Sequence, residues 1–213
     1  MPGELRARKE IILVVVTCEQ HSGGPMTNYG DMIDGRATLI TLMLREDHQK
    51  LKQLFTQFNE TTDTNEKRDI VTAAIAALDV RATLEEELIY PAWREHVEEQ
   101  SLVDEALKEH QVVHLLIKEL KKMDPEDERY DVKFVVLSKH VMHHIQQEEG
   151  KIFPQAEKAD LDWERLTKQV MQRRQSLEQK TLWLLGVPVI SGQSQTACAT
   201  RAVHSGRSGG RRG

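Results

Sequence analysis

Hydrophobic residues recur at helical spacing along most of the chain. From about residue 36 to residue 184, apolar side chains return every third or fourth position, with polar residues between them. This spacing collects the apolar side chains on one face of a helix. Asp124-Pro125 interrupts the pattern before the fourth apolar stripe, and Asp162 can cap a fifth helix. We therefore predict an all-α fold, an up-and-down four-helix bundle with an additional C-terminal helix.

Each of the four bundle stripes holds ionisable residues near its middle, where leucine or valine is expected. Buried charges are costly unless they are paired or bind a metal. Their occurrence at a similar depth on all four stripes predicts one shared site at the bundle centre, a common place for carboxylate–histidine metal sites. The residues are His48 on the first stripe, Arg81 and Glu85 on the second, His110 and His114 on the third, and His144 and Glu148 on the fourth.

An internal repeat supports a site with two centres. The run Glu85-Glu86-x-x-Ile89-Tyr90-Pro91 recurs 63 residues later as Glu148-Glu149-x-x-Ile152-Phe153-Pro154. Upstream, Asp47-His48-Gln49 recurs as Glu109-His110-Gln111. A repeat alone indicates structural duplication. Because this one reproduces a histidine and a carboxylate at the same inner positions, it favours a metal site with two centres.

The two copies differ at one position that matters for metal binding. His144 lies four residues before Glu148, but the equivalent residue before Glu85 is Arg81. A guanidinium is always cationic and has no lone pair to offer a metal. The second copy instead has additional histidines at helical spacing, in the pairs His110–His114 and His140–His144.

Composition narrows the class of protein and the chemistry of the site. The 213 residues carry 29 Lys+Arg and 34 Asp+Glu, a net charge of −5, which argues against nucleic acid as a partner. Cys18 and Cys198 both lie near the ends, which excludes a cysteine-ligated metal in the middle. No apolar run approaches the roughly 18–20 residues of a membrane span. We expect a cytoplasmic protein.

The ends of the chain differ in composition from the middle. We expect residues 1–35 to be a poorly ordered extension or an appendage from an upstream start. Residues 186–213 are rich in Gly, Ser, Thr and Arg, without hydrophobic period, and predict a disordered basic tail. The domain itself is expected to span residues 36–185.

Four runs of sequence resemble the bacterial hemerythrin-like HHE cation-binding domain: DHQKLKQLF, EEELIYP, EHQVVH and HHIQQEEGKIFP. The resemblance covers roughly residues 36–184. The family's ligand order is His, HxxxE, HxxxH and HxxxxE/D. In this chain it becomes His48, Arg81-x-x-x-Glu85, His110-x-x-x-His114, and His144 followed by Glu148 and Glu149. The family spacing favours Glu149 as the second bridging carboxylate, whereas the helical period and the repeat favour Glu148; we keep both, with a slight preference for Glu149.

The resemblance implies a non-haem di-iron centre bridged by two carboxylates. His110, His114 and His144 would hold one iron. His48 and the residue at position 81 would hold the other, at which the family binds dioxygen. Arg81 removes one ligand there and adds a fixed positive charge.

Three outcomes of this departure are open. The dinuclear site persists, with His140 or a water in the gap. A single iron is held by His110, His114, His144 and a carboxylate. Alternatively, the site is empty, and Arg81 forms a buried ion network with Glu85.

These residues favour a non-haem iron-binding protein that binds or handles dioxygen, peroxide or nitric oxide, or that buffers iron. The alternative is a structural or interaction bundle whose site is metal-free, and oxidase or peroxidase chemistry is a third possibility. Imidazole and carboxylate ligands suit iron, manganese and zinc alike, so iron rests on the resemblance. We expect no nucleic-acid or membrane partner for the domain, and a monomer or small homo-oligomer.

Overall fold

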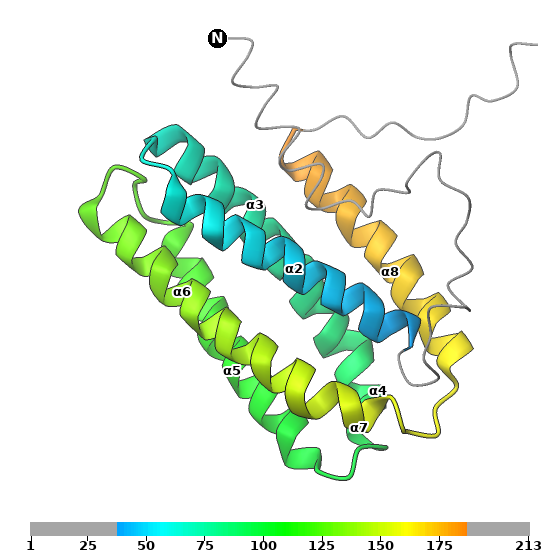
Figure 1. Cartoon of the computed structure of the whole chain (residues 1–213). Helices are drawn as coiled ribbons and strands as arrows, with labels where there is room; N and C mark the ends of the chain where they lie inside the picture. The colour runs from blue at the N-terminus through cyan, green and yellow to red at the C-terminus, as the bar shows by residue number, and fades with distance from the viewer. Residues whose placement is uncertain (1–37, 187–213) are drawn as a thin grey trace, which may run out of the picture.

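The computed structural model describes residues 38–186, and it confirms the predicted all-α fold (Figure 1). No strand lies between those two residues. Four long helices form an up-and-down bundle, and a fifth lies beside it. They are α2 (Leu39–Glu60), α3 (Thr64–Leu84), α5 (Gln100–Leu120), α6 (Glu128–Gln147) and the additional α8 (Trp163–Leu184). The expectations for residues 1–35 and for the tail after Gly186 lie outside the described residues.

Side chains that accept backbone hydrogen bonds define where several helices begin. Thr38 forms a reciprocal capping box with Thr41 at the start of α2. Asp63, Asp127 and the predicted cap Asp162 accept hydrogen bonds from the first turns of α3, α6 and α8. These caps satisfy N–H groups that have no partner within the helix. None of the helices in the described part of the chain could cross a membrane.

Two π-helical turns interrupt the bundle, each beginning at a carboxylate of the internal repeat. They are η1 (Glu85–Ile89) and η2 (Glu148–Ile152), followed by the short helices α4 (Tyr90–Arg94) and α7 (Phe153–Ala156). The N–H of Tyr90 donates to the Glu85 carbonyl, and the N–H of Phe153 donates to the Glu148 carbonyl, five residues back in each case. Proline follows both aromatic residues. Because proline lacks an N–H and its ring clashes with the carbonyl four residues earlier, it favours this widened turn.

The ionisable residues at the centre of the bundle form a polar layer, and this layer lies between two apolar clusters. One cluster includes Phe55, Phe58 and Phe134, and the other includes Trp93 and Phe153. Along α2 and α5, buried residues before and after the central histidine belong to different clusters. The apolar core thus surrounds the ionisable groups on both sides along the bundle axis and shields them from water.

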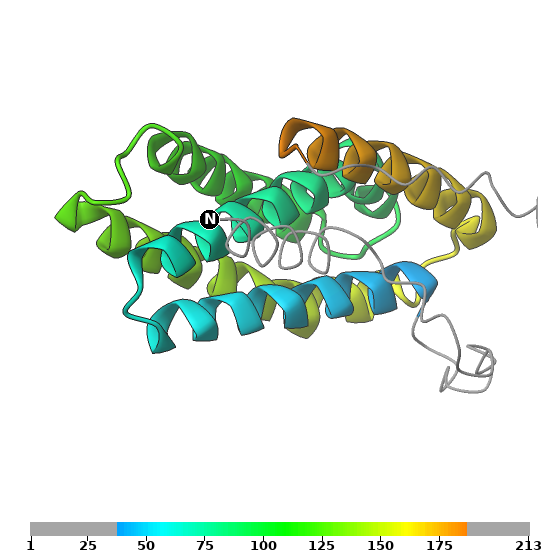
Figure 2. The same ribbon diagram turned by 90° about the horizontal axis from the view of Figure 1, so that it is seen from above.

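Helix α8 covers one side of the bundle. It contacts α3, α2 and η1, and Figure 2 shows it outside the four-helix arrangement, next to α3. Leu166, Val170 and Leu182 are buried in this contact. Arg174 is also buried; its guanidinium donates to both carboxylate oxygens of Asp47 at 2.8 Å and to Glu178 at 2.8 Å.

Candidate metal centre

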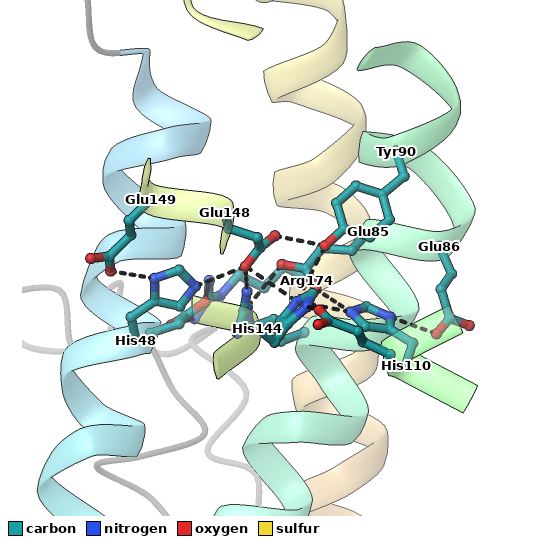
Figure 3. A network of polar contacts seen from close by, with 12 residues as sticks. His48, Glu85, Glu86, Tyr90, His110, His144, Glu148, Glu149 and Arg174 are labelled. Atoms are coloured by element: carbon teal, nitrogen blue, oxygen red, sulfur yellow. Dashed lines mark hydrogen bonds and ion pairs between the residues drawn. The ribbon is translucent and has the colours of Figure 1, made fainter. Parts of the chain in front are cut away.

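Six ionisable side chains meet in the polar layer, and none is more than 6% exposed. They come from every long element of the bundle (Figure 3). His48 lies on α2, Arg81 on α3, Glu85 at the start of η1, His110 on α5, His144 on α6, and Glu148 at the start of η2. The structure thus brings the central residues of all four stripes together, as the matching depth of these residues predicts.

Arg81 bridges the two buried carboxylates. Its Nε donates to Glu85 Oε1 at 2.8 Å, and its Nη2 donates to Glu148 Oε2. Burial opposes its charge, but Glu148 and Glu85 raise the pKa of the guanidinium above its usual range. Arg81 is therefore a permanent cation held between the two carboxylates that the resemblance implies as metal bridges.

One guanidinium cannot balance two buried carboxylates. Burial alone would raise the pKa of Glu148, but Arg81 and His144 hold it well below its usual range. The pKa of Glu85 is instead raised well above its usual range by burial, against the opposing charge of Arg81. The anionic form of Glu85 is therefore less stabilised than that of Glu148, and a further cation beside Glu85 would favour it.

Glu85, His110 and His144 form a group of three buried ligand atoms within 4.8 Å of one another. His110 Nε2 lies 3.2 Å from His144 Nε2 and 3.4 Å from Glu85 Oε2. Burial lowers the pKa of His110, which keeps its imidazole neutral. We call these three residues the metal trio.

Carboxylates behind the two histidines orient them toward the centre. His110 Nδ1 lies 2.8 Å from Glu86 Oε1, and His144 Nδ1 lies 2.8 Å from Glu109 Oε2. Hydrogen bonds from His110 and from His144 lower the pKa of Glu86 and of Glu109, respectively, so both are anionic acceptors. When the Nδ1 of each ring donates to its carboxylate, the two Nε2 lone pairs face each other. Two facing lone pairs beside a carboxylate repel unless a cation lies among them, so these residues fit a metal ion.

His48 occupies, in the first copy of the repeat, the position that His110 occupies in the second, and it lies on the other side of the centre. Its Nδ1 lies 2.6 Å from Glu149 Oε1, and its Nε2 lies 3.2 Å from Glu148 Oε2. Phe153 stacks on the His48 ring, with 5.7 Å between the ring centroids. Tyr90 packs against His110, with 5.5 Å between the ring centroids. The centre therefore has approximate two-fold symmetry, which the exchange of histidine for Arg81 breaks.

Glu148 and Glu149, the two candidates for the second carboxylate, occupy different environments. The Glu148 side chain is fully buried, whereas the Glu149 side chain is 27% exposed and also lies 3.4 Å from Lys52 Nζ. Regular α-helix continues to Gln147 and the π-turn begins only at Glu148, so Glu148 stays one turn after His144 on the inner face. Glu149 instead accepts the hydrogen bond from the outer nitrogen of His48.

Two further predicted residues lie away from the metal trio. The His114 side chain is 44% exposed, and its Nε2 lies 2.8 Å from Glu86 Oε1. It therefore lies behind His110 rather than beside it, contrary to the ligand set that the resemblance implies. His140 is exposed, because the inner face of α6 passes through Leu137, Val141 and His144. His140 thus lies on the exposed side of α6, not among the metal trio.

Tyr90 also takes part in the centre. Its hydroxyl donates to Glu148 Oε1 at 2.6 Å and lies 3.3 Å from His144 Nε2. Burial, together with the negative charges of Glu148 and Glu85, raises its pKa well above the usual range. The phenol therefore stays protonated and anchors Glu148. The signal in the sequence is that the second copy has Phe153 here, without the hydroxyl.

Comparison with protein families places these residues in a wider context. The family model described as hemerythrin HHE cation binding domain matches residues 39–156, which include every residue of the centre but not α8. Searches of curated proteins and of solved structures each gave no match. The family match covers more than half of the chain and agrees with the bundle and with its buried His/Glu group. The chain therefore belongs to the family of hemerythrin HHE cation-binding domains.

Proposed function

We propose that this protein binds one non-haem iron per chain through Glu85, His110 and His144, and that it binds a small ligand such as dioxygen or nitric oxide there. The observation that carries the proposal is the Arg81 bridge between Glu85 and Glu148. A fixed cation takes up the carboxylate oxygens that a second metal ion would need. The metal trio lies on the side of Glu85 that Arg81 does not engage, and its ligand atoms are free to bind one ion.

Electrostatics favours one metal over two. At an effective dielectric constant of about 20, a divalent ion about 4 Å from a guanidinium is repelled by roughly 8 kcal/mol, before the attraction of the carboxylates is counted. A second ion between His48 and Arg81 would meet this repulsion and gain only one imidazole. An ion in the metal trio gains two imidazoles and the oxygen of Glu85 that Arg81 does not engage.

The donor set supports iron as the metal and a small molecule as the ligand. Two histidines and one carboxylate with open positions are typical of mononuclear iron(II) sites that react with dioxygen. Iron(II) supplies positions at which diatomic ligands bind. Around it, Glu86 and Glu109 fix the orientation of the imidazoles, Tyr90 anchors Glu148, and Arg81 holds both carboxylates in place. Iron storage, ligand sensing and peroxide turnover would all use this arrangement. We place the protein in the cytoplasm, because both cysteines of the chain lie outside the domain.

Metal analysis of the purified protein tests the proposal. Protein from iron-supplemented cells should contain one iron per chain and lack the absorption of an oxo-bridged di-iron centre. His144→Ala should lose the iron, whereas His140→Ala, one turn earlier on the exposed side of α6, should keep it. His114→Ala should also keep it. Two irons in the wild type would refute the mononuclear site, and no bound metal would favour the interaction bundle instead.

A further inference from the structure

We infer that the diatomic ligand occupies an apolar cavity between α3, α5 and α6, on the opposite side of Arg81 from α8. This inference rests on the proposed one-metal function. The cavity measures about 20 Å³, and the metal trio forms its polar end together with Arg81. Its remaining walls are apolar side chains: Leu78, Ala82, Val113 and Val141. An open position on an ion in the metal trio would therefore face a ready-made apolar space.

The size of the cavity selects the class of ligand. A site needs about 10–15 Å³ of this kind of space to hold one water, so 20 Å³ accommodates a molecule of two heavy atoms. Pockets for organic substrates are far larger, about 300–1,000 Å³. The lining favours a neutral molecule, because small cavities walled by leucine, alanine and valine hold water poorly. Dioxygen and nitric oxide meet both conditions.

The cavity on the opposite side of Arg81 is smaller and more highly charged. The cavity there measures about 10 Å³ and is lined by three charged groups besides Arg81, namely Asp47, Lys50 and Arg174. The ion pair between Arg174 and Asp47 ties α8 over this side. The resemblance implies that dioxygen binds near His48 and position 81, but here that region holds a guanidinium and a charged helix contact. The ligand position has therefore moved across the centre, to the side of His110 and His144.

Two alanines on α3 allow a matched test. Ala82 lines the apolar cavity, and Ala77 lines the charged cavity on the α8 side. Each would be changed to leucine, and iron content and nitric oxide affinity of the iron(II) protein would be measured, the latter by electron paramagnetic resonance. Ala82→Leu should keep one iron per chain and bind nitric oxide at least tenfold more weakly. Ala77→Leu should keep both iron and affinity within about twofold of the wild type.

The outcomes separate this inference from the proposed function. If Ala82→Leu does not fold, Val141→Ile adds a single methylene to the same cavity and should weaken nitric oxide binding to a smaller degree. One iron per chain with unchanged affinity in the folded cavity variants would overturn the cavity assignment and leave the one-iron site standing. Weakening by Ala77→Leu instead would move the ligand to the α8 side. A wild type without iron would overturn both.

Discussion

Arg81→His tests the central interpretation, because it exchanges the fixed cation for the residue found at the equivalent position of the repeat. The guanidinium contacts two carboxylates that are at most 1% exposed. Removing one partner from a buried ion pair costs about 3–5 kcal/mol, since the other charge stays buried without compensation. In a domain of this size, 1 kcal/mol shifts the melting temperature by about 2–4 °C. The metal-free variant should therefore melt roughly 6–20 °C below the wild type.

Iron should reverse this loss in the variant. The new imidazole adds a ligand beside His48, and the repulsion between Arg81 and a second ion disappears. We expect two irons per chain in place of one, together with the absorption of a di-iron centre. Iron at one hundred times its dissociation constant would restore about 2.7 kcal/mol of stability for each site filled.

The assay combines calorimetry with and without iron and metal analysis of the same samples. Arg81→Met is the matched control: it also removes the charge but supplies no ligand, so it should lose stability without gaining a second iron. An Arg81→His protein that melts like the wild type and still holds one iron would refute the reasoning. Arg81 would then not be what prevents the second metal from binding.

Three further predictions concern groups around the centre. Glu86→Ala should weaken metal binding about 10–100-fold in calorimetric titration, because His110 loses the acceptor that orients it; unchanged affinity would remove Glu86 from any orienting role. Arg174→Met should lower the free energy of unfolding in urea by about 3 kcal/mol, the lower end of the range for a buried pair, because it leaves two carboxylates that are each 13% exposed unpaired. A loss below about 1 kcal/mol would mean that apolar contacts alone hold α8. Burial and Arg81 lower the pKa of His48, and burial lowers that of His110. Below about pH 6.5 these two histidines therefore bind more protons in the unfolded chain than in the native one, which outweighs the single extra proton that the raised pKa of Glu85 gives the native state. The melting temperature of the metal-free protein should fall between about pH 7 and pH 5; a constant value would contradict neutral buried imidazoles.

The helices and the existence of a shared polar layer could be predicted from the sequence. Periodicity identifies the inner face of a helix, and polar residues on four inner faces at one depth must meet when the helices pack. The all-α bundle with its fifth helix is confirmed, and the membership in the family agrees with the motifs.

The assignment of individual ligands could not be predicted as well. Residues four apart on a helix point in similar but not identical directions, so spacing alone did not show that His114 and His140 lie outside the metal trio while His110 and His144 lie within it. The choice between Glu148 and Glu149 depended on where a π-turn begins. The partners of the histidines, such as Glu86, come from other helices, and no local pattern announces them.

The two π-turns impose a condition on any attempt to transplant this centre into a designed bundle. Each π-turn contains one residue more than an α-helical turn. About 3.6 residues complete a turn of α-helix, so each residue rotates the chain by about 100°. The extra residue therefore changes the direction of the side chains that follow it. A graft of the central residues onto ideal helices would keep their spacing up to Glu85 and Glu148 and then misdirect the side chains after these two carboxylates. The Tyr90 hydroxyl would point away from Glu148, and Phe153 would leave the face of His48. A functional graft must therefore carry the proline after each aromatic residue, although neither proline contacts the centre by any polar group.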